Sequence, residues 1–334
     1  MIKYSKTYSN IFKIKEDYLN FNDRELSLIK KINKYYAKQK LRKKCKICFK
    51  KLKQPTLKSF GVSYIFCNNC NHLNGIHEDT KNFHKFLYSG KTKNINFGKI
   101  YLKNFNKVLK NIHYPKVKFL KQVIKKKLNL LDYGSGAGHF VKACLNHGIN
   151  AWGVEKNIQL HKFAKHKIRE RALLAKENNL EEIIEKNKIE CMSLIFVLEH
   201  LPNPHYIFDL FKKSRLTYLY ISVPMASPLI FFENVFPNVY PRHLGGAHTH
   251  LFTKKSLSYL KKKYNFKIIG EWWFGTEFAD LYRSIIASNN LNNSLSQKLR
   301  KKKIDDFFLK NLDNLQSIFD RQKLSSELHF IIKK

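Results

Sequence analysis

The segment from Leu130 to Phe140 constrains the fold of this chain more than any other, because a short apolar run ends in an acidic residue and three alternating glycines. The apolar run predicts a strand, and the helical spacing that resumes at Phe140 predicts a helix, so the glycines lie in a strand-to-helix turn. Glycine lets the backbone turn sharply there and approach a ligand closely. A dinucleotide-binding fingerprint would need a glycine at position 139, and a P-loop would end in Gly-Lys-Ser/Thr, so neither phosphate-binding pattern fits.

The next predicted strand carries a second acidic residue at its end. Residues 149–155 form an apolar run whose last position is Glu155, 23 positions after Asp132. In an open α/β sheet, ligands bind in the crevice outside the carboxyl ends of the strands, so Asp132, the glycine turn and Glu155 are expected to face one pocket. A carboxylate at this tip can accept hydrogen bonds from both hydroxyls of a ribose. The spacing therefore predicts a site for an adenosyl cofactor.

A third segment, from Glu190 to Pro204, completes a family pattern. It contains an apolar run followed by the turn Glu-His-Leu-Pro-Asn-Pro at positions 199–204. Together with the glycine turn and Glu155, this order of motifs resembles the class I S-adenosylmethionine-dependent methyltransferases, in which the apolar run is the fourth strand. The resemblance covers roughly residues 100–334. It implies an α/β fold, with a Rossmann-like, doubly wound, seven-stranded sheet whose last strand, near 327–332, is antiparallel.

The resemblance also assigns residues that bind S-adenosylmethionine. They lie in the first strand, the glycine turn, the tip of the second strand and the segment after the third strand: Asp132, Gly134, Ser135, Gly136, Gly138, Glu155 and Asn179. Two positions depart from the family pattern. Glu190 stands where the family usually has aspartate, and residues 178–179 are both asparagine where the family has an acid-containing contact to adenine.

The candidate catalytic residues are Glu199 and His200, in the turn after the fourth strand. The sulfonium of the cofactor already carries an activated methyl group, so the protein mainly has to align donor and acceptor. A base is needed only where the acceptor atom holds a proton, and His200 is the first candidate because the ordinary pKa of histidine lies close to working pH. Glu199 orients that histidine or replaces it. His243, His248 and His250 are second candidates, although a hydrogen bond within its own loop is the commoner role of such a residue.

Four of the six cysteines form two Cys-x-x-Cys pairs separated by 18 residues. This spacing brings two hairpin knuckles together around a tetrahedral zinc ion. The predicted metal ligands are Cys45, Cys48, Cys67 and Cys70, with His72 as a weaker candidate. Two disulfides are the alternative, which the reducing compartment expected for a chain without a secretory signal disfavours.

The formal net charge of +38 raises the question of a nucleic-acid partner, because lysine and arginine neutralise phosphates. Lysine supplies 54 of the 63 basic residues and arginine only nine. Arginine is the usual choice for bidentate contacts to phosphates and bases, and an AT-rich coding bias produces abundant lysine by itself. We therefore expect a small-molecule acceptor and regard nucleic acid as the less favoured partner. An anionic acceptor, such as a nucleotide-linked sugar, suits the positive field.

The chain divides into four predicted pieces: a basic helical N-terminal arm (1–42), a zinc ribbon (43–75), a helical linker (76–99) and a methyltransferase core (100–334) with a helical insertion at about 275–325. In the arm, Asn22 and Asp23 predict the N-cap of a helix whose apolar face packs on the protein. No apolar run approaches the length of a membrane span, and no apolar segment follows Met1. We therefore expect no membrane partner and a cytoplasmic location.

A zinc ribbon ahead of this core is similar to two kinds of methyltransferase. One kind is the sugar C-methyltransferases and related small-molecule enzymes of polysaccharide or natural-product pathways, and the other is the zinc-ribbon rRNA guanine methyltransferases. The Glu-His turn favours the first kind, although Val197 stands where some sugar C-methyltransferases have a tyrosine. The predicted function is methyl transfer from S-adenosylmethionine to a sugar or nucleotide-linked sugar. An rRNA or tRNA methyltransferase and a non-catalytic module that only binds the cofactor are the alternatives.

Overall fold

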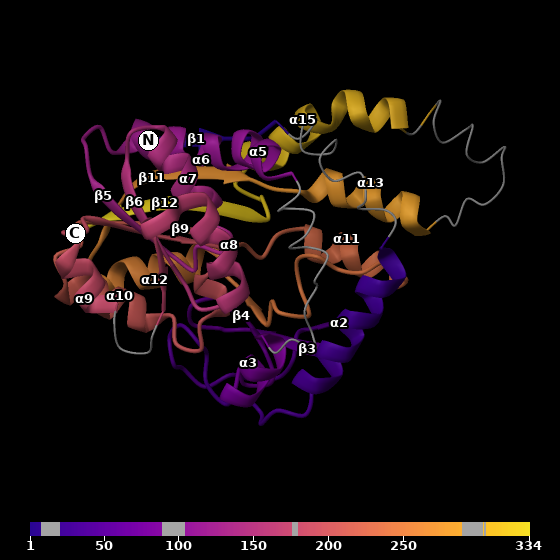
Figure 1. The fold of residues 1–334 in the computed structure, drawn as a ribbon. Coiled ribbons are helices and arrows are strands. Elements are labelled where there is room, and N and C mark those ends of the chain that lie inside the picture. Colours follow the sequence, from indigo (N-terminus) through magenta and orange to yellow (C-terminus); the bar gives the residue numbers. More distant parts are fainter. Residues whose placement is uncertain (8–20, 89–103, 176–179, 289–302, 304) are drawn as a thin grey trace.

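A computed structural model describes residues 1–7, 21–88, 104–175, 180–288, 303 and 305–334. Its largest element is an eight-stranded sheet (Figure 1). In spatial order the strands are β1 (Ile2–Tyr4), β11 (Lys267–Phe274), β12 (Glu327–Lys333), β9 (Tyr218–Pro224), β8 (Cys191–Ile195), β5 (Asn129–Tyr133), β6 (Asn150–Glu155) and β7 (Ala172–Leu174).

The strand order confirms the Rossmann-like α/β class. Strands β7, β6, β5, β8 and β9 are parallel, and β12 runs antiparallel between β9 and β11. These are the seven strands that the resemblance implies, with the antiparallel strand last in the chain. Strand β1 adds an eighth at the edge of the sheet, where Ile2 pairs with Glu271 in parallel register. The first residues of the chain, which were expected in a basic arm, therefore belong to the main sheet.

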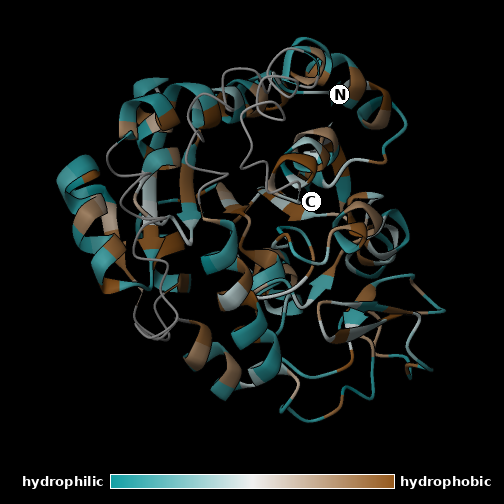
Figure 2. Cartoon of the chain, turned by 90° about the vertical axis from the view of Figure 1, so that its right-hand side faces the viewer, coloured by the Kyte–Doolittle hydropathy of each residue, from teal (hydrophilic) through white to brown (hydrophobic). Residues whose placement is uncertain are grey.

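Two hydrophobic clusters cover the two faces of this sheet. Successive residues of a strand point to opposite faces, so Leu219 and Ile221 of β9 belong to one cluster and Tyr220 belongs to the other. Strands that are buried on both faces form nearly continuous apolar runs, which is why they stand out in the sequence. Figure 2 shows helices in which hydrophobic and hydrophilic stretches lie side by side, as expected for helices that pack on a sheet along one face.

Among the described residues of the domain, three helical segments directly precede β5, and most of the other helices alternate with the strands along the chain. The helical segments are α5 (Phe105–Val108), the π-helix η2 (Leu109–His113), α6 (Tyr114–Val123), α7 (His139–Asn146), α8 (Ile158–Ile168), the 3-10 turns η3 (Arg169–Arg171) and η4 (Leu198–His200), α9 (Leu180–Lys186), α10 (His205–Lys213), α11 (Leu229–Val235), α12 (Lys254–Tyr264), α13 (Glu277–Ser288) and α15 (Asp306–Arg321). Residues of α6 and α7 contribute to one cluster and residues of α10 and α12 to the other. None of the helices in the described ranges is long and apolar enough to cross a membrane.

A second, four-stranded sheet combines the N-terminal segment with the domain core. It consists of β2 (Leu57–Ser59), β3 (Val62–Phe66), β4 (Leu73–Gly75) and β10 (His250–Leu251). Strand β10 comes from the second half of the chain and pairs antiparallel with β4. The sheet lies below the main sheet in Figure 1, beside α2 (Asn22–Tyr36) and α3 (Lys81–Tyr88). The predicted zinc ribbon is therefore completed by a strand from the methyltransferase core.

Helix α2 begins at the predicted place, but its predicted cap is wrong. Phe21 precedes the first helical residue, and in the described part of the chain no side-chain hydrogen bond caps this end. The Asn22 amide instead donates a hydrogen bond to the carbonyl oxygen of Asn238 (2.8 Å), and its oxygen accepts one from the backbone N–H of Tyr240 (3.0 Å). Asn22 thus ties the helix to a distant loop. The apolar face packs on the protein as predicted, with Leu26, Ile32 and Tyr36 buried.

Candidate active site and cysteine cluster

The glycine turn between β5 and α7 has the conformation that the sequence requires. Gly134, Gly136 and Gly138 have φ angles of +76°, +55° and +80°, in the region that side chains disfavour. A Cβ atom on Gly134 would lie 2.7 Å from Cγ2 of Val197. The turn therefore packs directly against the segment that leads to Glu199, so the predicted cofactor site and the predicted catalytic turn are neighbours.

Glu155 lies at the tip of β6, and the glycine turn orients its carboxylate. Oε2 accepts a hydrogen bond from the N–H of Gly136 (2.7 Å), and Oε1 accepts one from the N–H of Asn157 (2.6 Å). Each oxygen keeps a second lone pair, so the carboxylate can still accept both ribose hydroxyls. Asn157 was not among the residues predicted from the sequence; its side chain also caps α8 by accepting hydrogen bonds from the N–H groups of Gln159 and Leu160. An asparagine directly before a helical pattern was the available signal.

Asp132 is buried in β5, two residues before the first glycine of the turn. The side-chain oxygen Oδ1 accepts a hydrogen bond from the Ser193 hydroxyl on the neighbouring strand β8 (2.7 Å). Burial raises the pKa of Asp132 to about 7, although the Ser193 hydrogen bond and the charge of Lys116 oppose this shift. Ser135 is also buried. Asn179, the remaining predicted cofactor contact, lies outside the described residues.

Asp132→Asn is expected to stabilise the cofactor-free protein more at about pH 8 than at about pH 5.5. The ordinary pKa of 3.8 applies to the unfolded chain, whereas the folded value is about 7. Between these values the folded protein holds a proton that the unfolded chain has released, so its stability falls as the pH rises, and asparagine removes this dependence. Because one pKa unit corresponds to about 1.4 kcal/mol, the gain in free energy of unfolding should be about 2 kcal/mol larger at the higher pH.

Urea unfolding of wild type and Asp132→Asn at both pH values measures this difference. Asp209→Asn, at an exposed position of α10, is the matched control and should show the same small effect at both. An equal gain for Asp132→Asn at the two pH values would contradict the prediction.

Glu199 and His200 lie in η4, directly after β8, and a third side chain joins them. His248 reaches them from the loop before β10, and its ring centroid is 5.2 Å from that of His200. Nε2 of His200 lies 3.9 Å from Oε1 of Glu199. The structure thus brings both predicted catalytic residues together with one of the three second candidates.

The protonation states of this pair differ from the sequence-based expectation. Burial lowers the pKa of His200 to about 3, with further contributions from the charges of His248 and Lys46. Burial raises the pKa of Glu199 to about 8. The ordinary histidine pKa, on which the preference for His200 as base rested, therefore does not apply in the folded protein.

The other two second candidates have structural contacts outside this cluster. The His243 ring pairs through Nε2 with the carbonyl oxygen of Met225, and its backbone N–H donates to Oε1 of Glu233 (2.9 Å). His250 pairs through Nδ1 with Nε2 of His72 (2.9 Å). His72 therefore forms a hydrogen bond with another histidine and is not part of the cysteine cluster. Its prediction as a weaker candidate for a metal ligand is wrong.

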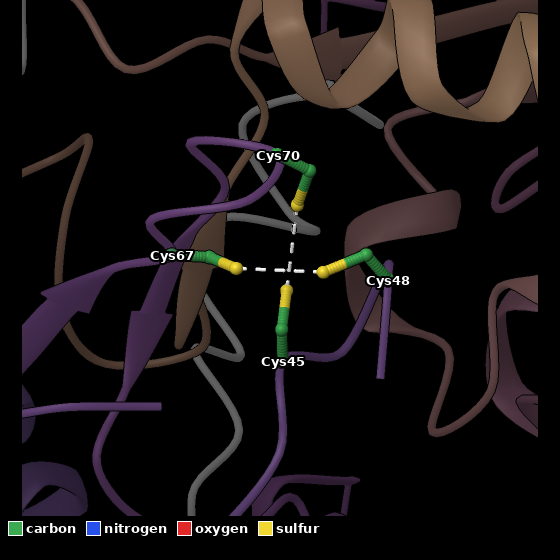
Figure 3. A group of neighbouring side chains, drawn as sticks. All are labelled: Cys45, Cys48, Cys67 and Cys70. Atoms are coloured by element: carbon green, nitrogen blue, oxygen red, sulfur yellow. Dashed lines mark hydrogen bonds between the residues drawn. The ribbon is translucent and has the colours of Figure 1, made fainter. Parts of the chain in front are cut away.

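The four predicted metal ligands converge on one point (Figure 3). The sulfur atoms of Cys45 and Cys70 are 3.6 Å apart, and those of Cys48 and Cys67 are 3.4 Å apart. All six cysteines of the chain are free thiols, so the disulfide alternative does not describe this structure. A tetrahedral zinc ion with Zn–S bonds of about 2.3 Å needs sulfur atoms about 3.8 Å apart. The cluster fits such an ion with small side-chain adjustments.

The backbone around each Cys-x-x-Cys pair has the same shape. Phe49 and Asn71, the residues after the second cysteine of each pair, both have left-handed φ angles (59° and 55°). Their N–H groups donate to the carbonyl oxygens of Cys45 (3.0 Å) and Cys67 (2.7 Å). Two equivalent knuckles therefore present the four thiols, as the spacing predicts.

A buried polar network joins the cysteine cluster to the loop before β10 that carries His248 and Thr249, called here the active-site loop. The Asp79 carboxylate forms ion pairs with Lys46 (2.6 Å) and Arg42 (3.0 Å). It also accepts a hydrogen bond from the hydroxyl of Thr249 (2.5 Å), the residue after His248. Lys46 lies between Cys45 and Ile47 in the first knuckle. This network could not be predicted from the sequence, because its members are far apart in the chain.

The strand order, with the glycine turn after β5 and Glu155 at the tip of β6, is that of a Rossmann-like α/β domain. A family model described as a methyltransferase domain matches residues 104–271, half of the chain. The protein belongs to this methyltransferase family, and it is an S-adenosylmethionine-dependent methyltransferase. A comparison with curated protein sequences finds no match.

Several solved structures resemble the fold. A SAM-dependent methyltransferase from Archaeoglobus fulgidus shares 17% identity over 70% of this chain and 100% of that chain, with a TM-score of 0.41. The plantazolicin methyltransferase BamL, solved with S-adenosylhomocysteine, shares 15% identity over 75% of this chain and 93% of that chain, with a TM-score of 0.44. Phosphoethanolamine N-methyltransferase 2 from Haemonchus contortus shares 12% identity over 78% of this chain and 62% of that chain, with a TM-score of 0.43.

Proposed function

We propose that this methyltransferase acts on a small molecule, a sugar or nucleotide-linked sugar of surface-polysaccharide or secondary metabolism. One observation carries the proposal. Glu199 is only 1% exposed; it lies two residues after Val197, which packs on the glycine turn, and its carboxyl group lies within 4.8 Å of a ring nitrogen of His248. An acceptor atom can meet this carboxylate only inside the fold, which suits a small molecule better than a base within a folded RNA.

The roles of the residues follow from their places. Glu155 holds the ribose of S-adenosylmethionine, and the glycine turn lets the backbone approach the cofactor. Glu199 and His200 face the acceptor and handle the proton of its reacting atom. The methyl group passes from sulfur to the acceptor in line, so correct placement of the two reactants supplies much of the acceleration.

We further propose that the cysteine cluster binds a structural zinc ion. Four buried thiols from two equivalent knuckles form a closed donor set, which is typical of structural zinc sites. The ion would hold the small sheet together and would take no part in methyl transfer. Its place beside Lys46 supports a role in fixing the network that reaches the active-site loop.

An RNA acceptor is the second candidate, because the net charge is +38. The small sheet argues against it. In zinc-ribbon RNA recognition the ribbon must present a surface to the nucleic acid, but here β4 pairs with β10 of the core and its apolar residues share a cluster with Leu244 and Leu251. An RNA methyltransferase predicts tight, steeply salt-dependent RNA binding, whereas we expect weak binding at physiological salt.

Calorimetric titration with S-adenosylhomocysteine tests the cofactor site. Glu155→Ala is expected to weaken binding about a hundredfold or more, because it removes two charge-assisted hydrogen bonds to the ribose and frees the N–H of Gly136. Glu170→Ala, an exposed glutamate in η3, is the control and should bind like wild type. Equal affinities of Glu155→Ala and wild type would show that Glu155 does not hold the ribose.

The acceptor class is tested by following methyl transfer to nucleotide-linked sugars and to total RNA. Transfer to a nucleotide-linked sugar supports the proposal. Transfer to RNA alone would establish the second candidate, and cofactor binding without transfer to any acceptor would favour the non-catalytic alternative.

A further inference from the structure

Glu199, His200 and His248 form a cluster that is separate from the four cysteines. Each side chain offers one possible ligand atom, and these atoms all lie within 4.8 Å of one another. Two of the residues come from η4, and the third comes from the loop before β10. A carboxylate and two imidazoles are thus brought together by two distant segments, next to the glycine turn.

Glu199 lacks the partners that a buried carboxylate needs. It is 1% exposed, and neither carboxylate oxygen has a hydrogen-bond partner in the described part of the chain. Nδ1 of His200 is likewise buried without a hydrogen-bond partner among the described residues. A buried carboxyl group whose oxygens lack hydrogen bonds costs free energy as the neutral acid, and more as the charged carboxylate. A bound cation between these side chains would remove that cost.

His248 is oriented as a metal ligand would be. Its Nδ1 lies 3.0 Å from the carbonyl oxygen of His243, so this nitrogen donates to the backbone and Nε2 is left for a ligand. In metal-binding histidines, the ring nitrogen that does not bind the metal nearly always donates a hydrogen bond, for example to a backbone carbonyl or a carboxylate. The His243 carbonyl is itself held in place, because the N–H of His243 donates to Glu233 (2.9 Å).

The donor set selects the kind of ion. Two imidazoles and one carboxylate are typical of catalytic zinc and related divalent ions, which keep a coordination position open. Two ligand atoms that are each about 2.1 Å from a metal ion lie roughly 3.4 Å apart when the coordination is tetrahedral. They lie up to about 4.2 Å apart when they are on opposite sides of the ion. One possible ligand atom of each side chain lies within 4.8 Å of the others, so small side-chain adjustments would bring the three into this span.

We propose that Glu199, His200 and His248 bind one divalent transition-metal ion, Zn²⁺ or Mn²⁺, and that its open position takes a hydroxyl oxygen of the methyl acceptor. The role in acceptor binding rests on the proposed function. The ion draws electron density from the bound hydroxyl, whose proton passes to the Glu199 oxygen that does not bind the ion and then to water. The oxygen forms a bond to the methyl carbon, the carbon–sulfur bond breaks, and its electron pair stays on sulfur as S-adenosylhomocysteine leaves.

Titration of the full-length, zinc-loaded protein with Mn²⁺, followed by electron paramagnetic resonance, tests the site. Elemental analysis of the same preparation counts the ions. Mn²⁺ prefers nitrogen and oxygen donors, whereas four thiolates select zinc, so the probe separates the two clusters. We expect two ions per chain in total for wild type and one for Glu199→Gln and His248→Gln, whose Mn²⁺ affinity should fall at least about a hundredfold. Glu185→Gln, at an exposed position of α9, should match wild type.

Binding of S-adenosylhomocysteine by each variant shows that it is folded. A wild-type protein that holds one ion and binds no Mn²⁺, or variants that bind Mn²⁺ as tightly as wild type, would overturn the inference. If wild type methylates a sugar nucleotide without a second ion, the metal site is wrong and the proposed function stands. If the second ion binds at these residues but no sugar is methylated, the metal site stands and the acceptor class is wrong.

Discussion

Cys48→Ala is expected to release the zinc ion from the cysteine cluster, to unfold the small sheet and to abolish methyl transfer. Structural zinc contributes directly to folding, on the order of 10 kcal/mol in isolated zinc-finger peptides. The strands beside the knuckles are short, since β2 and β4 contain only three residues each, and the cysteine side chains themselves belong to the hydrophobic cluster of the core. We therefore expect the free energy of unfolding to fall by at least about 3 kcal/mol.

The loss should extend to the active site because β4 is shared. His250 pairs with Asn74 in the antiparallel register of β10 and β4, two residues after His248. If the knuckle next to β4 unfolds, the backbone hydrogen bond from Gly75 to Thr249 and the pairing of β4 with β10 are lost, and both of these contacts help to fix the loop that brings His248 to His200. Zinc content, thermal unfolding and methyl transfer measure the three effects. Cys144→Ala, a buried cysteine of α7, is the matched control and should keep its zinc.

Retention of one zinc ion per chain by Cys48→Ala, with unchanged thermal stability, would contradict the assignment of the cluster. Retained zinc with lost activity would also contradict it, because the activity is expected to depend on this thiol only through the ion.

The main sheet and the conformation of the glycine turn could be predicted because their signals are local in the sequence. An apolar run such as that of β5 indicates a strand that is buried on both faces of the sheet. The glycines that follow it indicate a turn with positive φ angles. Glu155 and Glu199 each follow such a run directly. The fold then brings the ends of neighbouring parallel strands together, so the sequence order alone indicates which residues share a site.

The active-site loop and the polar network could not be predicted in the same way. His248 meets Glu199 only because a two-residue strand, β10, pairs with β4, and two residues leave no periodic pattern. Three residues of β1 join the main sheet for a similar reason. The pKa of His200 likewise depends on burial by several distant segments, and no spacing in the sequence contains that information.

Asp79→Asn is expected to lower the free energy of unfolding by about 3–5 kcal/mol, because it leaves two buried cations without their counter-ion. The side chain of Asp79 is 4% exposed, and those of Lys46 and Arg42 are 4% and 10% exposed. The adjacent residue provides a matched control. Glu78 forms an ion pair with Lys40 at the surface, with side chains 36% and 71% exposed, so Glu78→Gln should cost less than about 1 kcal/mol.

The cost of Asp79→Asn should depend on pH with a definite sign. The charges of Lys46 and Arg42 hold the pKa of Asp79 well below its ordinary value of 3.8, so the ion pairs stabilise the fold above that value. As the pH falls below about 4, protons bind preferentially to the unfolded chain and this contribution is lost. Urea unfolding at decreasing pH should therefore show wild type approaching Asp79→Asn in stability.

The same variant separates the acceptor side of the site from the cofactor side. Asparagine can keep a hydrogen bond to Thr249 but cannot hold Lys46, so the loop that carries His248 loses its tie to the first knuckle. Among the described residues, neither Glu155 nor the glycine turn shares a hydrogen bond or an ion pair with this network. We expect methyl transfer to fall at least about tenfold while S-adenosylhomocysteine affinity stays within about twofold of wild type. An equal loss of both would mean that the network supports the whole domain and has no particular relation to the acceptor site.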